Sequence, residues 1–75
     1  MTALDVSFRY GTVPGEAVMR ALDSVRDVYG IRRLQLDEKT SSVRVEFDAS
    51  RLSEEIVARL LRQAGLDIRE KLAHA

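Results

Sequence analysis

The sequence contains no cysteine, so it can form no disulfide, iron–sulfur cluster or thiolate zinc site. The missing cysteine leaves the redox compartment open. Long apolar runs are absent as well. After Met1 and Thr2 the chain enters a strand-like pattern, with no basic segment ahead of it. This beginning predicts neither a signal peptide nor a membrane span, so we expect a cytoplasmic protein with no membrane partner.

Neither sign of charge predominates, because 12 Lys and Arg balance 12 Asp and Glu. Nucleic-acid binders concentrate positive charge to displace counterions from phosphates, and here Arg32-Arg33 is the one adjacent basic pair. We therefore expect no nucleic-acid partner. With 45% hydrophobic and 32% charged residues, the 75-residue chain fits one compact domain over residues 1–75. Its ends, residues 1–2 and 73–75, are expected to be frayed.

The first half of the chain changes its apolar period once. Alternation with a period of two predicts a half-buried strand over residues 3–10, and residues 11–15 read as a loop. A period of three to four then predicts an amphipathic helix from Glu16, with Pro14 suited to the first turn and Gly30 as its stop. Its apolar stripe comprises Val18, Leu22, Val25 and Tyr29, widened by Ala21 and Val28.

The second half predicts two strands, a helix and a last strand. The strands span residues 31–36 and 43–47, joined by the polar hairpin segment 37–42. Ser50 or Ser53 caps the second helix, which ends at Gly65. Its stripe is Ile56, Leu60 and Ala64, broadened by Val57 and Leu61. In the short last strand Leu66, Ile68 and Leu72 are expected to point inward, with Glu70 interrupting that side.

These elements predict an α+β fold. Each helix has one apolar side, so both must cover the same face of the sheet. Right-handed crossovers then give a ferredoxin-like β-α-β-β-α-β sandwich, with a four-stranded antiparallel sheet and two helices on one face. The second and fourth strands should form the edges, where charges discourage edge pairing but leave a weak homodimer open. Those charges are Arg32, Arg33, Arg69 and Lys71.

The stretch from Gly11 to Leu66 resembles a heavy-metal-associated domain. The resemblance rests on an ordered set of short pieces: Val18, Ala21-Leu22, Val25, Gly30-Ile31, Leu34-Gln35-Leu36-Asp37, Val43-Arg44-Val45-Glu46-Phe47-Asp48, Ser53-Glu54-Glu55-Ile56 and Ala64-Gly65-Leu66. The family's metal motif, Met-x-Cys-x-x-Cys, falls on Thr12, Pro14 and Ala17. None of the three matches. Copper(I) prefers thiolate and thioether donors, so the resemblance implies a degenerate member that carries over no metal ligand and no cofactor.

Other chemistry finds little support. His74 is the one histidine and lies in the tail, so it can form neither a triad nor a selective metal site. Acylphosphatases share this topology but use an asparagine, which the chain lacks. RNA-recognition domains stack bases on aromatic residues of the open sheet face. That face is expected to be a mixed-charge surface of Asp5, Ser7, Arg9, Arg44, Glu46, Arg69 and Lys71. We therefore expect no enzyme.

Three functions stay open. The first is a non-enzymatic protein-interaction or regulatory module without metal-binding cysteines. By resemblance its partner surface would include Thr12, Pro14, Arg20, Asp23, Arg59 and Arg62. The second keeps metal handling, either through thiols donated by a partner or through Asp5, Glu16, Met19 and His74. The third is a small-molecule sensor of the ACT type, in which Gly11 and Gly15 would face a ligand.

Overall fold

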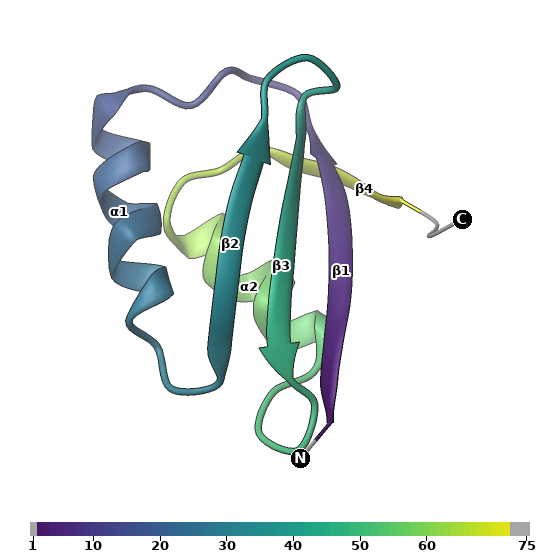
Figure 1. Cartoon of the computed structure of the whole chain (residues 1–75). Helices are drawn as coiled ribbons and strands as arrows, with labels where there is room; N and C mark the ends of the chain where they lie inside the picture. The colour runs from purple at the N-terminus through teal and green to yellow at the C-terminus, as the bar shows by residue number, and fades with distance from the viewer. Residues whose placement is uncertain (1, 73–75) are drawn as a thin grey trace.

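The computed structural model describes residues 2–72. Its elements follow the predicted order: β1 (Ala3–Tyr10), α1 (Glu16–Arg26), β2 (Ile31–Asp37), β3 (Ser42–Asp48), α2 (Glu54–Gln63) and β4 (Ile68–Leu72). The strands form one antiparallel sheet in the order β2-β3-β1-β4. Both helices cover the same face of this sheet (Figure 1). The ferredoxin-like sandwich is thus confirmed, with β2 and β4 at the edges.

The core lies between the sheet and the helices. In β1 the predicted alternation holds for Val6, Phe8 and Tyr10, which are all buried, while Leu4 is 47% exposed. The other buried apolar side chains are Leu22, Val25, Leu34, Val43, Val45, Phe47, Val57, Ala58, Leu61, Leu66 and Ile68. Burying one large side chain fully contributes about 1.5–3 kcal/mol, so this shared core holds the two layers together. Phe8, Tyr10 and Phe47 all face it, so none of them offers a stacking platform on the open face.

The first helix is shorter than the sequence predicts. It ends at Arg26, with Asp27 as its C-cap. Tyr29 therefore does not belong to the helical stripe: it is 73% exposed, and the guanidinium carbon of Arg51 lies 4.5 Å from the centroid of its ring. Gly30 has a φ of 102°, but it serves the turn into β2 instead of the helix end. The expectation failed because a Tyr fits an apolar period whether or not the helix continues.

The start of α1 also differs from the prediction. Gly15 is the N-cap and Glu16 the first helical residue. Pro14 thus lies one position before the N-cap, outside the first turn. Its ring still restricts the backbone of the loop that leads into the helix.

The second helix is capped at both ends as the sequence suggests. Ser53 is the N-cap, and its side-chain oxygen accepts a hydrogen bond from the N–H of Ile56 at 3.3 Å. At the other end Gly65, with φ 100°, donates to the carbonyl of Arg62, and Leu66 donates to that of Leu61. This pair of bonds is a Schellman motif, which a left-handed glycine permits.

The buried stripe of α2 is rotated from the predicted one. Val57 and Leu61 are fully buried, whereas Ile56 is 39% exposed. Leu60 and Ala64 are only partly buried against the core. Val57 and Leu61, which were predicted to broaden the stripe, thus form its centre. No helix within residues 2–72 is long and apolar enough to cross a membrane.

A bulge in β4 reverses the predicted faces of its second half. Tyr10 pairs with Ile68 and Arg9 with Glu70, so Arg69 is the extra residue. The extra residue turns every later side chain to the other face. Glu70 consequently lies on the open face, where it forms an ion pair with Arg9 at 3.1 Å. Lys71 turns toward the helices and pairs with Glu54 of α2, so it does not belong to the open face.

Candidate functional site: the loop between β1 and α1

The loop over residues 11–15 joins the sheet to α1 at one end of the molecule (Figure 1). Backbone hydrogen bonds hold both of its ends. The N–H of Gly11 donates to the carbonyl of Asp67 at 2.9 Å, and the carbonyl of Gly15 accepts from the N–H of Met19 at 3.0 Å. The loop is therefore fastened to the start of β4 on one side and to α1 on the other.

A polar cluster around Asp67 adds side-chain contacts to the first of these ends. Its Oδ2 accepts from the hydroxyl of Thr12 at 3.2 Å and from Nε of Arg69 at 3.1 Å. The guanidinium also forms an ion pair with the same oxygen at 3.0 Å. The side chains of Asp67 and Arg69 fill the space where a Cβ on Gly11 would lie. A Cβ at position 11 would therefore displace these two side chains.

Asp67 is the residue of this site that sequence reasoning missed. The signal was available, because antiparallel pairing of the first and last strands brings the start of the last strand beside the end of the first. Asp67 precedes β4 and Gly11 follows β1. The topology predicted from the sequence is therefore compatible with Asp67 beside the loop.

The three positions of the metal motif offer no soft donor. Thr12 and Ala17 are exposed and Pro14 is half-buried, and of these only Thr12 has a side-chain donor atom, a hydroxyl oxygen. Copper(I) requires thiolate or thioether ligands, and a structural zinc site requires several thiolates or imidazoles. The nearby Asp67 carboxylate is already neutralised by Arg69. The residues present therefore do not fit the thiolate-bound metal ion that the resemblance to heavy-metal-associated domains would imply.

The alternative ligands do not converge. Asp5 lies on the open face of the sheet, where its carboxylate and Nη2 of Arg44 are 2.6 Å apart. This hydrogen bond raises the pKa of Arg44 and favours its charged form. Glu16 and Met19 lie on α1, across the sheet, and Glu16 pairs with Arg20 at 2.6 Å. Within residues 2–72 no three His, Cys, Asp or Glu side chains are grouped to hold a metal ion.

His74, the fourth candidate ligand, lies outside the described residues, as do Met1 and the other residues of the tail. Thr2, expected to be frayed, is described, and its carbonyl accepts a hydrogen bond from the N–H of Ala49 at 2.7 Å.

Three solved structures share this architecture. Apo-CopP from Helicobacter pylori superposes with a TM-score of 0.73 at 19% identity, over 88% of this chain and all (100%) of that one. The yeast copper transporter domain Ccc2a, solved in apo and Cu(I)-loaded states, gives 0.71 at 15% identity over 95% of this chain and 97% of that one. The chain has the fold of heavy-metal-associated domains. The N-terminal domain of ZntA in the apo form gives 0.69 at 20% identity over 96% and 97% of the two chains.

Sequence comparison adds no closer relation. No protein-family model matches the chain, and no curated protein matches it in sequence. The shared property is thus the heavy-metal-associated fold.

The predicted interaction residues occupy separate positions around the helices. Asp23 lies on the β2 side of α1, where it pairs with Arg26 at 2.6 Å. Arg20 points to solvent beside Glu16. Arg59 and Arg62 line one shallow hollow on α2, together with Glu55, Ala58 and Gln63. The role of all these residues stays a prediction.

Proposed function

We propose that this chain is a non-enzymatic protein-interaction module that uses the heavy-metal-associated fold without a thiolate metal site. The observation that carries the proposal is the loop, where Thr12, Pro14 and Ala17 occupy the motif positions and Asp67 accepts a hydrogen bond from Thr12. Backbone and side-chain hydrogen bonds hold the loop in place. A loop held in this way can present side chains to a partner.

Val13 is the side chain that this loop presents. It is 73% exposed, between Thr12 and the restricted backbone of Pro14. An apolar side chain held on an ordered loop loses little conformational entropy on binding. Arg20 and Asp23 on α1, with Arg59 and Arg62 on α2, would supply further charged contacts at separate points outside the loop. The proposed partner is another protein.

Metal titration tests the first half of the proposal. Copper(I) or zinc is added to the wild-type protein and to the variant Thr12→Met/Pro14→Cys/Ala17→Cys while amide NMR shifts are recorded. We expect no localised shifts over residues 11–17 in the wild type at micromolar metal, and tight copper(I) binding in the variant, since the scaffold then carries the missing sulfur donors. Copper bound stoichiometrically to the purified wild type would refute the proposal.

Partner capture tests the second half, and the chain offers a matched control. Val13 and Tyr29 are both 73% exposed and lie in loops at opposite ends of the molecule (Figure 1). Proteins captured by the wild type from its native cell should be lost with Val13→Ser and retained with Tyr29→Ser. An identical set of captured proteins with all three baits would show that the loop is not the partner surface.

A second candidate function is metal handling with thiols supplied by a partner. The observation that favours it is the likeness to Ccc2a, described as a copper transporter domain and solved with Cu(I). Elemental analysis of the protein purified with its captured partner separates the two candidates. Copper or zinc that travels with the complex and is lost with Val13→Ser would favour metal handling, and a metal-free complex would favour the interaction module.

A further inference from the structure

The outer edge of β2 carries backbone groups that no strand within residues 2–72 uses. The N–H of Asp48 donates to the carbonyl of Gly30 at 2.7 Å, so the backbone groups of Asp48 point from β3 toward β2. Backbone N–H and C=O groups point to alternate sides along a strand, so those of Arg44, four residues before Asp48, also point toward β2. Gln35 of β2 pairs with Arg44, and its backbone groups point toward β3. The N–H and C=O of Leu34 and Leu36 therefore point away from β3.

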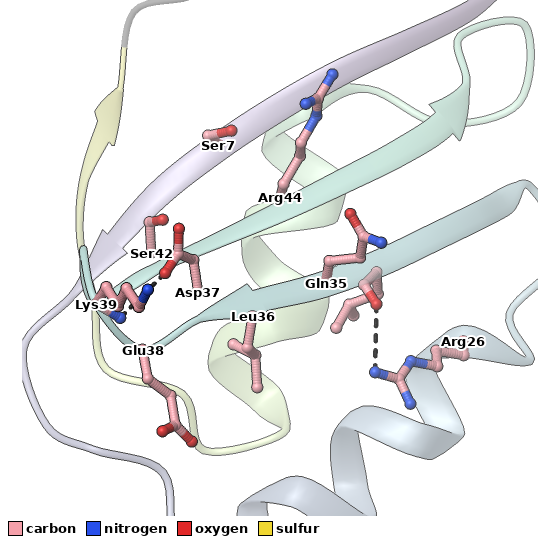
Figure 2. Close-up of a pocket in the computed structure, with 10 residues that line it drawn as sticks. Ser7, Arg26, Gln35, Leu36, Asp37, Glu38, Lys39, Ser42 and Arg44 are labelled. Carbon is pink, nitrogen blue, oxygen red and sulfur yellow. Dashed lines mark hydrogen bonds between the residues drawn. The ribbon is translucent and has the colours of Figure 1, made fainter.

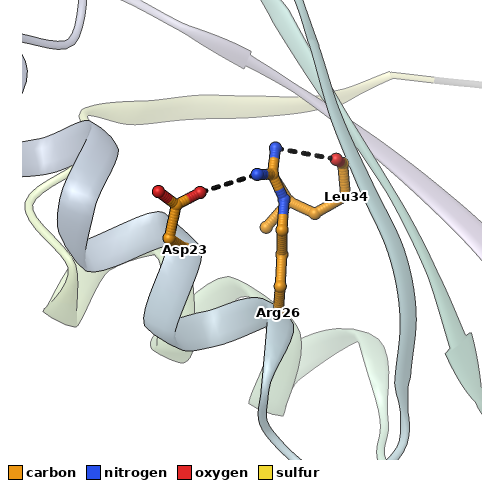
Figure 3. Close-up of polar contacts among 3 residues, drawn as sticks. All are labelled: Asp23, Arg26 and Leu34. Carbon is orange, nitrogen blue, oxygen red and sulfur yellow. Dashed lines mark hydrogen bonds and ion pairs between the residues drawn. The ribbon is translucent and has the colours of Figure 1, made fainter.

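One side chain from α1 covers part of this edge. Nη2 of Arg26 donates to the carbonyl of Leu34 at 3.2 Å, and Nη1 is braced by Asp23 at 2.6 Å (Figure 3). A carbonyl satisfied in this way is blocked toward an incoming strand, which is one means by which native sheets protect their edges. Figure 2 shows Arg26 reaching this edge from the helix side, while Gln35 and Arg44 lie on the open face.

We propose that the β2 edge is a self-association site, at which β2 of a second copy pairs antiparallel about a two-fold axis through Gln35. In this register Leu34 of each copy is opposite Leu36 of the other. Because both residues present their backbone groups to the edge, each such pair can exchange both of its N–H···O=C bonds. Leu34 is buried and Leu36 half-buried on the helix side, so the pairing also extends the apolar layer.

Charge complementarity selects this register. Arg33 of each copy falls opposite Asp37 of the other, and both side chains are exposed on the open face. Asp37 uses Oδ1 to accept from the N–H of Lys39 at 3.0 Å, which leaves Oδ2 for the guanidinium. A two-fold axis through Leu34 would instead place Arg33 opposite Gln35 and Ile31 opposite Asp37, with no charge paired. A two-fold axis between two residues would pair each residue that faces the helices with one that faces the open side of the sheet, which breaks the match of the two faces.

Arg26 sets how readily the pair forms, because it must release the Leu34 carbonyl in both copies. Removing it leaves that carbonyl open to the partner strand. In Arg26→Ala the bond between Arg26 and the Leu34 carbonyl no longer has to be broken in either copy. The loss of these two bonds should strengthen association by roughly 5- to 150-fold. Should that variant fold poorly, Asp23→Ala removes the carboxylate that positions the guanidinium of Arg26, and it should also strengthen association.

The test uses sedimentation equilibrium of the full chain from micromolar to millimolar concentration. Arg33→Glu and Asp37→Lys each turn both interchain charge pairs into repulsions and should each weaken self-association about tenfold or more. Mixed together, the two variants restore every pair, since Glu at 33 meets Lys at 37 and the native Asp37 meets the native Arg33. The mixture should therefore associate at concentrations where neither variant does so alone.

Two results would overturn the proposal. One is an Arg26→Ala protein that stays monomeric at millimolar concentration. The other is a dimer that neither charge variant weakens and that mixing does not restore. Sedimentation of the purified chain measures self-association alone, whereas the loop experiments measure metal binding and partner capture, so failure of one proposal is distinguishable from failure of the other.

Discussion

The hydroxyl of Thr12 and Oδ2 of Asp67 are 3.2 Å apart, and their hydrogen bond ties the loop before α1 to the start of β4. The same oxygen is held by Arg69. One carboxylate therefore organises the end of the loop that contains Thr12.

Replacing that carboxylate should loosen the loop. We expect Asp67→Ala to lower the free energy of unfolding by about 0.5–1.5 kcal/mol, because the contacts are charge-assisted but partly open to solvent. Urea unfolding measures the loss, and hydrogen exchange at Gly11 should become faster. Thr12→Val is the matched control, since it removes one hydroxyl and leaves the Arg69 pair; its effect should be smaller. Unchanged exchange at Gly11 in Asp67→Ala would contradict the assignment.

Gly65 should tolerate substitution poorly. Its φ of 100° disfavours any L side chain, and an added Cβ would lie 3.2 Å from Cγ2 of Val18. Gly65→Ala is expected to lower the free energy of unfolding by about 1–2 kcal/mol. Gly15→Ala is the control, because that position has a φ of −81° and nothing within 4 Å of the added methyl group. Thermal unfolding of the two variants should differ clearly, and equal melting temperatures would count against the strain at Gly65.

The sequence determined the element order and most of the core because both follow from local periodicity. Strand alternation predicted the inward direction of Val6, Phe8 and Tyr10. The apolar faces of the helices, with the crossover rule, predicted the sandwich and its two edge strands. The sequence could not determine where each regular apolar pattern ends. Tyr29 fits a helical period, yet turns after Arg26 carry it to the surface.

The bulge in β4 could not be predicted either, because it also interrupts a regular pattern. Nothing in the alternation of Leu66, Ile68 and Leu72 reveals one extra residue, since the bulge is fixed by pairing with β1. In the candidate site, the missing sulfur donors could be read directly from the sequence. Asp67, the carboxylate beside the loop, is far from Thr12 in the chain, so it could be placed there only through the predicted pairing of the first and last strands and not from any local motif.

The rotated stripe of α2 makes a direct prediction about stability. Leu61 is fully buried, while Ile56 is 39% exposed in the first turn of the helix. Leu61→Ala should lower the free energy of unfolding by about 2–5 kcal/mol through lost burial and a residual cavity. Ile56→Ala removes a similar side chain from a site still partly in water and should have a much smaller effect. Urea unfolding of both variants checks the order, and a larger loss for Ile56→Ala would restore the originally predicted stripe.

Acid should weaken the fold through Asp48, a buried carboxylate at the end of β3. Its pKa is lowered, first by the hydroxyl of Ser50, which donates to Oδ1 at 2.6 Å, and then by the Ser50 N–H at 3.0 Å; burial opposes them. A carboxylate whose folded pKa lies below its unfolded pKa stabilises the fold above the unfolded value. That stabilisation is lost as pH falls from the ordinary Asp range through the lowered pKa.

Ser50→Ala should therefore raise the pKa of Asp48 toward its ordinary value, which a carbon-detected NMR titration of the carboxyl group measures. It should also lower the free energy of unfolding at neutral pH, and this difference from the wild type should shrink once the pH is below both pKa values. Ser42→Ala is the matched control: its hydroxyl pairs at 2.7 Å with that of Thr40, and neither group titrates in this range. The stability loss of Ser42→Ala should thus be independent of pH across the window in which that of Ser50→Ala disappears. Parallel pH profiles for the two variants would mean that Ser50 acts on the turn alone and not through the charge of Asp48.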